Sequence, residues 1–263
     1  MTTIKRMLSV FLITLLLLSG CAAPACTAEK APAASTTAPT AAPTPESPVV
    51  TSLLRVIAAD ESGSTLLADI SNRAVYRNRL PDGKAYPVGT LLEVTTTASV
   101  MAIYPAQFDK VQAVKLLEEG FDDRCALYLQ VLEDLWKEDQ ALQSEIDYIG
   151  IDLSETSLTP SEQDALAWRF AELKGKQLVQ GTWEELAEQG FIDKENLYWE
   201  NGCLLSIHEE GFLTDEEKDP NKITFRAEKW RSGLGAIMFT DCTAERNKTG
   251  HWSEYTPGGF AIA

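Results

Sequence analysis

The sequence has few of the residues on which many enzyme mechanisms depend. It contains two histidines, His208 and His251, among 263 residues. Neither histidine lies in a His-Glu-x-x-His motif, and no serine stands in the Gly-x-Ser-x-Gly pattern of a nucleophile elbow. The segment Gly233-Leu234-Gly235 is too short for a phosphate-binding loop. We therefore expect no histidine-based catalysis, no cofactor and no bound metal.

The apolar run near the N-terminus is short. Residues 8–18 form an 11-residue run, whereas a spanning helix needs about 20 residues. The run follows Lys5 and Arg6 and precedes small residues, which is typical of a secretory signal. It ends at Leu18-Ser19-Gly20-Cys21, which resembles the lipobox of bacterial lipoproteins. The resemblance implies cleavage after Gly20, lipid on Cys21, and a partner in the membrane that this lipid enters.

Aromatic residues and a helical or strand period are absent from residues 22–48. These 27 residues include ten Ala, six Pro and five Thr. Such a segment buries too little apolar surface to offset its ordering entropy, and its prolines favour extended conformations. We expect a tether that holds a folded part away from the membrane, facing outside the cytoplasm.

Basic residues are scarce, and they are unevenly distributed. The chain has 23 Lys or Arg against 39 Asp or Glu, a net charge of −16. Residues 51–117 have seven basic and six acidic residues, whereas residues 118–263 have 13 and 31. This change in charge divides the folded part into a small β-barrel domain (50–117) and an acidic α+β domain (118–263). With the signal peptide (1–20) and the lipidated tether (21–49), the chain has four predicted parts. The negative charge argues against a nucleic-acid partner.

Short strands with turn residues between them fill the smaller module. We expect strands at residues 53–59, 65–70, 74–80 and 111–117, and a hairpin of residues 91–97 and 100–104. A closed five-stranded barrel of the OB type would remove the exposed edges. The stretch from Gly89 to Val94, with Ile103-Tyr104-Pro105-Ala106-Gln107, resembles a small domain of unknown function in Gram-positive lipoproteins. The resemblance implies a barrel-like fold and a surface location.

Helical signals come first in the acidic module, and strand signals follow. Thr159 and Thr182 each begin a capping box, and Asn201-Gly202 between apolar runs predicts a hairpin. Further strands at residues 223–230, 236–242 and 252–255 predict an α+β fold with an antiparallel sheet. The series from Thr182 through residues 230–236 to 241–244 resembles an uncharacterised segment of clostridial-type lipoproteins, with no activity attached.

Aromatic residues beside arginine mark a candidate binding surface. These residues are enriched where proteins bind partners, although ordinary core packing is the alternative. The candidates are Trp230, Arg231, Trp252 and Tyr255.

Cys203 and Cys242 lie on predicted strands of one sheet. They are candidates for a disulfide, with two buried thiols as the alternative. The acidic loop at residues 215–221 lacks the spacing of a calcium loop and is interpreted as solvated.

These observations predict a lipid-anchored envelope protein with a non-catalytic binding or accessory role. Its partner would be an envelope protein or a wall polymer. The alternative is a hydrolase of cell wall or peptide that uses carboxylates of the acidic module, which a cleft of facing carboxylates with a perturbed pKa would favour.

Overall fold

The computed structural model describes residues 48–212 and 219–263, and its fold is α+β and rich in sheet. All the described residues belong to one compact unit, Pro45–Ala263, which includes both predicted modules. The predicted signal peptide, Cys21, nearly all of the tether and most of the acidic loop at 215–221 lie outside the described residues. No helix in the described part is long and apolar enough to cross a membrane.

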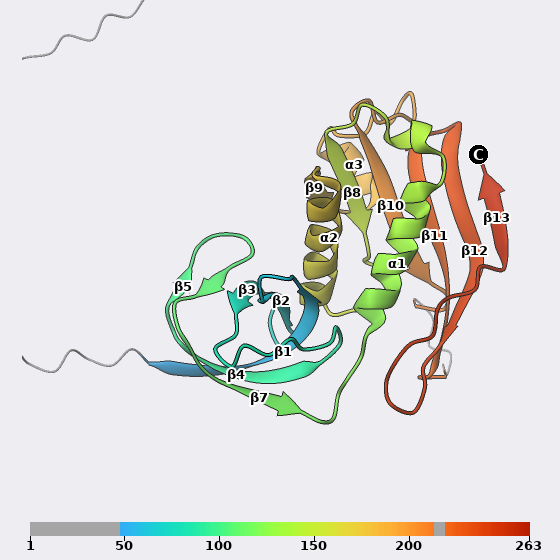
Figure 1. The fold of residues 1–263 in the computed structure, drawn as a ribbon. Helices are drawn as coiled ribbons and strands as arrows, with labels where there is room; N and C mark the ends of the chain where they lie inside the picture. Colours follow the sequence, from blue (N-terminus) through green and yellow to red (C-terminus); the bar gives the residue numbers. More distant parts are fainter. Residues whose placement is uncertain (1–47, 213–218) are drawn as a thin grey trace, which may run out of the picture. The chain divides into compact units, whose positions relative to one another are not determined.

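Five strands form the first sheet, in the order β3-β2-β1-β4-β7 (Figure 1). They are β1 (Val49–Ala59), β2 (Ser64–Asp69), β3 (Val75–Arg79), β4 (Leu91–Thr97) and β7 (Val111–Leu117). All neighbours are antiparallel, and β4 returns to lie beside β1, which is Greek-key order. Alternate residues such as Leu54, Val56 and Leu92 form its apolar core.

Hydrogen bonds do not close this sheet into the predicted barrel within the described residues, since β3 and β7 remain its two ends. The outer edge of β3 is occupied by a different segment. Ala106 N donates to Val75 O and Arg77 N donates to Ala106 O, both at 2.9 Å. The Asn78 amide also pairs with the backbone of Phe108. Residues 106–108 therefore occupy the edge that closure by β7 would need.

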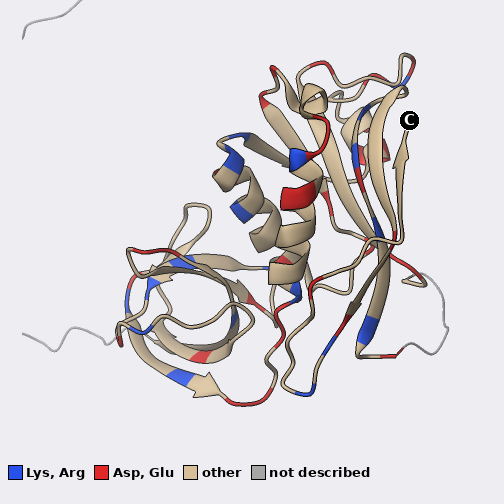
Figure 2. Cartoon of the chain, turned by 45° about the vertical axis from the view of Figure 1, so that its right-hand side comes forward, with Lys and Arg blue, Asp and Glu red and all other residues tan. Residues whose placement is uncertain are grey.

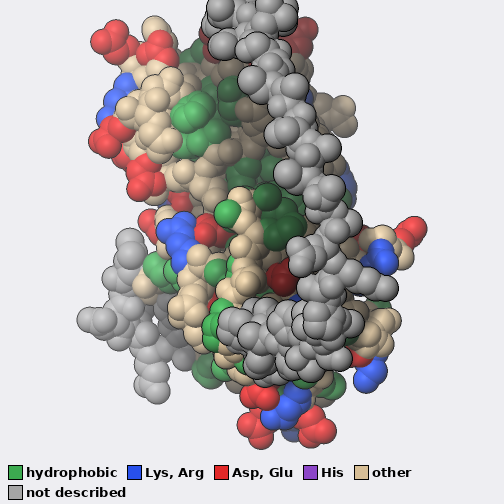
Figure 3. Space-filling model, turned by 90° about the vertical axis from the view of Figure 1, so that its left-hand side faces the viewer, with side chains coloured by type: hydrophobic (Ala, Val, Ile, Leu, Met, Phe, Trp, Pro, Cys, Tyr) green, Lys and Arg blue, Asp and Glu red, His purple; other side chains and the backbone are tan. Residues whose placement is uncertain are grey.

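The predicted hairpin of residues 91–97 and 100–104 is wrong. Strand β4 is flanked by β1 and β7 on its two edges, so neither edge is free. Residues Val100–Met101 (β5) pair instead with Gln107–Phe108 (β6) as a separate ribbon. Figure 3 views the molecule from the side of this ribbon, where apolar side chains reach the surface. Val100, Met101, Ile103 and Tyr104 are among the exposed ones.

Six strands form the second sheet, in the order β13-β12-β11-β10-β8-β9. They are β8 (Tyr148–Asp152), β9 (Gln177–Gln180), β10 (Gly202–Glu209), β11 (Lys222–Ser232), β12 (Gly235–Glu245) and β13 (Gly259–Ile262). The antiparallel prediction is confirmed for β10 to β13. In addition, β8 and β9 join in parallel, because α2 (Pro160–Lys174) connects them as a crossover helix.

Helices lie on both faces of this sheet. Helices α1 (Arg124–Lys137) and α2 pack on one face, against Cys203, Leu205 and Ile207 of β10. The short helix α3 (Trp183–Glu188) packs on the other face, against Leu204. A 3₁₀ turn, η1 (Gln140–Gln143), follows α1. Figure 2 shows many of the charged residues on loops and helices.

The capping boxes predicted from the sequence are confirmed at the starts of α2 and α3. Thr159 and Thr182 both form complete capping boxes, with Glu162 and Glu185 as the partners. The Asn201-Gly202 hairpin is wrong, because Trp199 is fully buried outside any strand. A Cβ atom on Gly202 would lie 2.2 Å from the Trp199 ring, so this glycine allows an aromatic ring to pack on the backbone, and the turn at residues 200–201 does not join two paired strands.

Candidate functional site

The four residues predicted to form one binding surface lie in three different environments. Trp252 and Tyr255 line a hollow beside α1, and Trp230 lines another hollow beside α3. The Arg231 guanidinium donates to the backbone oxygens of Ser144 and Glu200, both at 2.8 Å. Arg231 therefore holds loops together, and the predicted single surface is not formed.

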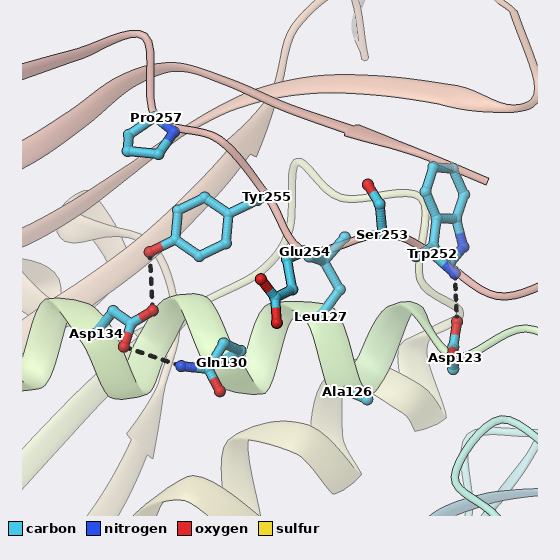
Figure 4. A pocket seen from close by; sticks show the side chains of 10 residues that line it. All are labelled: Asp123, Ala126, Leu127, Gln130, Asp134, Trp252, Ser253, Glu254, Tyr255 and Pro257. Atoms are coloured by element: carbon cyan, nitrogen blue, oxygen red, sulfur yellow. Dashed lines mark hydrogen bonds between the residues drawn. The ribbon is translucent and has the colours of Figure 1, made fainter. Parts of the chain in front are cut away.

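The helix-side hollow lies between α1 and residues 252–257 and has a volume of about 580 Å³ (Figure 4). Tyr255 points toward α1 and its hydroxyl donates to Asp134 at 3.1 Å. Trp252 N donates to Asp123 at 2.8 Å, and the Trp252 indole N–H donates to Asp122 at 2.9 Å. These bonds fasten the segment to the helix.

Most carboxylates of the helix-side hollow are already used by the protein. Burial raises the pKa of Asp134, but hydrogen bonds from Lys137, Gln130 and Tyr255 outweigh this effect and lower the pKa. Asp123 accepts from the Trp252 backbone and pairs with the His251 ring at 2.9 Å. The polar groups here stabilise the fold, and among the described residues no hydrogen bond or ion pair engages the Glu254 carboxylate.

The sheet-face hollow has a different character. It lies on the α3 side of the second sheet, has a volume of about 340 Å³, and its lining comes from β8, β10, β11 and the start of α3. Trp183 and Trp230 form an aromatic wall, with ring centroids 5.8 Å apart at an interplanar angle of 80°. Its lining residues are Asp152, Ser154, Glu155, Thr182, Trp183, Glu184, Leu204, Ser206, His208, Glu228 and Trp230.

Strand register arranges the floor of this hollow in rows. Leu204 of β10 pairs with Gly150 of β8 and Trp230 of β11, which makes one row apolar. Two residues along, Ser206 pairs with both Asp152 and Glu228. Paired residues project to the same face of a sheet. Asp152, Ser206 and Glu228 therefore form a polar row across three strands.

Several polar groups in this row lack a partner among the described residues. Ser206 is only 6% exposed as a residue, and it lines the hollow, so its hydroxyl faces the space that a ligand would fill. Asp152 is 7% exposed and accepts from Ser154 through Oδ1 alone. Burial raises the pKa of Glu228, although His208 and Arg226 oppose the shift. These groups are available to a ligand.

His208 stands at the far side of the row. Its Nδ1 lies 3.0 Å from Glu155 Oε2, which fixes the orientation of the ring. In the described ranges no group of three or more His, Cys, Asp or Glu side chains could hold a metal ion.

Sequence reasoning named Trp230 as a binding residue but missed the rest of this site, although one signal pointed to it. Ser206 and His208 alternate with apolar residues in a strand that is otherwise buried, and Glu228 and Trp230 alternate in the same way on β11. The pairing of the two strands, which puts these residues together, is not visible in a single sequence.

The predicted disulfide is not formed. Cys203 and Cys242 are buried free thiols, on β10 and β12 respectively. Strand β11 lies between these two strands, which alone separates them by two strand spacings, roughly 9.5 Å. The register also places Cys203 level with Arg231 and Cys242 level with Phe225, six residues apart along β11, whereas a disulfide needs Cα atoms within about 7 Å.

No family model, curated protein or solved structure matches this chain. The functional assignment therefore depends on the geometry of the two hollows.

Proposed function

We propose that this chain is a lipid-anchored envelope protein of the Gram-positive lipoprotein type with a non-catalytic binding role, and that the sheet-face hollow is its ligand site. The observation that carries the binding role is Ser206. This residue is only 6% exposed and lines the floor of the hollow, between Asp152 and Glu228 on the neighbouring strands and beside two tryptophans. A concave site with an apolar wall and a few convergent polar groups is typical of small-ligand binding.

Residues 1–21 support export and anchoring in the membrane, because a basic start and a short apolar run precede the lipobox-like Leu-Ser-Gly-Cys. Intact-mass analysis of the membrane-extracted protein should show a chain that starts at Cys21 and carries acyl groups. A chain that starts elsewhere without lipid would exclude this anchor.

The first sheet supports an OB-like reading of the small module. Its Greek-key order and five strands are those of a partly open barrel of this type. In this proposal the small module helps to hold one edge of the ligand site in place. Arg73 of the module pairs with Asp164 of α2 at 2.8 Å, and Asp164 also accepts from the Gln180 amide at 3.0 Å. Gln180 lies two residues before Thr182, which lines the hollow.

Native mass spectrometry of the full-length protein from membranes tests the binding role. We expect a small molecule to remain bound to the wild type and to Trp252→Ala, which alters only the helix-side hollow. Ser206→Leu fills the floor of the sheet-face hollow and should lose the molecule. If Ser206→Leu proves unfolded by circular dichroism, Trp183→Ala at the half-buried wall replaces it. A wild type without any bound molecule, or equal retention by the hollow variants, would refute the proposal.

One observation favours a hydrolase as the second candidate. Asp152 and Glu228 flank Ser206 from both sides, so their Cα atoms are about 9.5 Å apart, two strand spacings. The raised pKa of Glu228 suits a general acid, and glycosidases use a pair of carboxyl groups on the two sides of the bond that they cleave. Incubation with purified peptidoglycan distinguishes the candidates. If the wild type releases reducing ends and both Glu228→Gln and Asp152→Asn abolish this release, the protein is a hydrolase and the non-catalytic binding role is refuted.

A further inference from the structure

The sheet-face hollow has an unbalanced charge. Its lining includes four carboxylates, those of Asp152, Glu155, Glu184 and Glu228, and no lysine or arginine from the described residues. The one ion pair within it joins Glu155 to His208, and it is charged only when the histidine is protonated. Carboxylates in a partly desolvated site without cations are costly unless a ligand supplies the positive charge.

Neighbouring basic residues do not fill this role. Arg226 pairs with His208 in the sheet register, but its side chain is exposed and outside the lining of the hollow. Lys229 is next to Glu228 in sequence, yet alternation sends it to the other face, where its ammonium donates to Asp139 O and Gln143 Oε1.

The wall of the hollow suits a cation as well. Trp183 and Trp230 lie in edge contact, and neither ring has a lysine or arginine over it among the described residues. Tryptophan is the aromatic side chain that best attracts a cation placed over its face. Ser206 adds a hydroxyl oxygen that accepts an N–H where the cation is a protonated amine.

We propose that the sheet-face hollow binds a small organic cation, a protonated amine or a quaternary ammonium group, between the two tryptophans and the Asp152-Ser206-Glu228 row. This inference rests on the proposed binding function and names the chemical class of its ligand. The acidic surroundings support it, because residues 118–263 have 31 acidic and 13 basic residues, and such a field draws cations toward the site.

Two other ligand classes fit less well. A bare metal ion would need several oxygen ligands at bonding distance, and no such group occurs among the described residues. A neutral sugar would stack on the tryptophans and use Ser206, but it would leave the buried Asp152 and the half-buried Glu228 without a counter-charge.

Binding of the cation should increase with pH. Glu228 faces Asp152, Glu155, Glu184 and His208 within the hollow and Arg226 at its margin. Burial raises the pKa of Glu228, so part of its charge appears only above the ordinary range of a glutamate. The ammonium probe keeps its charge throughout this range, so the pH dependence reports on the protein.

The test uses full-length protein in nonionic detergent, with n-butylammonium and its neutral analogue n-butanol as probes. Nuclear magnetic resonance titrations follow the indole N–H signals of Trp183 and Trp230. We expect n-butylammonium to bind about tenfold more tightly than n-butanol, and Glu228→Gln to remove most of this preference. Glu254→Gln in the helix-side hollow makes the same change of net charge and should alter the dissociation constant less than about twofold.

Each outcome separates the ligand class from the binding role. Equal affinity for the two probes, or tighter binding of N-acetylglucosamine, would overturn the cation inference and leave the hollow as a binding site. An equal loss in Glu254→Gln and Glu228→Gln would also overturn it, because the effect would then come from net charge alone. If no probe shifts the two tryptophan signals while the membrane-purified protein retains its bound molecule, the ligand is not a cation and the binding role stands.

Discussion

Ser206 lies directly opposite Glu228 in the antiparallel pair of β10 and β11, and neither side chain has a hydrogen-bond partner among the described residues. A folded protein usually satisfies such groups, so in the proposed binding role this pair stays unsatisfied until a ligand occupies the hollow. The cost should be visible when the ligand is absent.

Glu228→Gln should stabilise the ligand-free protein at neutral pH. Burial raises the folded-state pKa of Glu228 above its unfolded value of 4.5, so the folded state holds this proton more tightly. Its contribution to stability is full below the unfolded pKa and is lost as pH rises through the folded pKa. The amide carries no charge, so we expect a gain below about 1 kcal/mol at pH 7, after discounting for solvent screening.

Urea unfolding of wild type and Glu228→Gln between pH 4 and 7 measures this effect. Glu254→Gln is the control, because Glu254 is exposed and the change of charge is the same. A gain for Glu228→Gln that does not grow with pH would contradict the explanation.

A second prediction concerns the ion pair that connects the first sheet to α2. Arg55 Nε donates to Glu162 Oε1 at 2.6 Å, and the side chains are 12% and 6% exposed. The same guanidinium donates to Gly120 O at 2.7 Å, while Glu162 completes the capping box of α2. Arg55→Met leaves the buried Glu162 charge unpaired and should lower the free energy of unfolding by about 3–4 kcal/mol.

Lys115→Met is the matched control for Arg55→Met. Lys115 pairs with Glu93 at 3.3 Å on the same sheet, but its side chain is 66% exposed. Exposed pairs contribute little, so we expect a loss below about 0.5 kcal/mol in the urea midpoint analysis. Similar losses for the two variants would show that the buried pair does not hold the sheet to the helix.

Sequence predicted the parts of this fold that depend on neighbours along the chain. The capping boxes at Thr159 and Thr182 involve residues three positions apart, and both formed. The hairpin at Asn201-Gly202 failed because the ring of Trp199 packs on Gly202, a contact that turn statistics do not include. The Asp152-Ser206-Glu228 row depends on the register of three strands far apart in sequence, so a single sequence could not reveal it.

A third prediction concerns the thiols. Burial raises the pKa of Cys203 to about 12 and that of Cys242 to about 11, and it also raises the pKa of Cys125. Thiolate is the reactive form, so none of the three should react with iodoacetamide in the native protein at pH 8. All three should react in guanidinium without prior reduction, as peptide mass mapping would show. A Cys203–Cys242 peptide linked by a disulfide would contradict the structure.

The last prediction concerns Lys229, which is fully buried on the helix side of β11. Its ammonium donates to the backbone oxygens of Glu138 and Asp139 and to Gln143 Oε1. Burial lowers the pKa of Lys229, and no carboxylate pairs with it among the described residues. Glu138 is the C-cap of α1, where backbone carbonyls attract a cation, while Asp139 is the N-cap of η1 and Gln143 is its last residue.

Lys229→Met retains the apolar stem but removes the donor that Glu138 O, Asp139 O and Gln143 Oε1 share. We expect the free energy of unfolding to fall by about 1–2 kcal/mol, with α1 and η1 losing hydrogen-exchange protection first. Lys222→Met is the control on the same strand, because Lys222 is exposed and should change stability by less than about 0.5 kcal/mol. Because Lys229 and Glu228 face opposite sides of the sheet, Lys229→Met should leave cation binding by the folded protein unchanged. A loss of binding at temperatures where the variant is fully folded would mean that the two faces are coupled through β11.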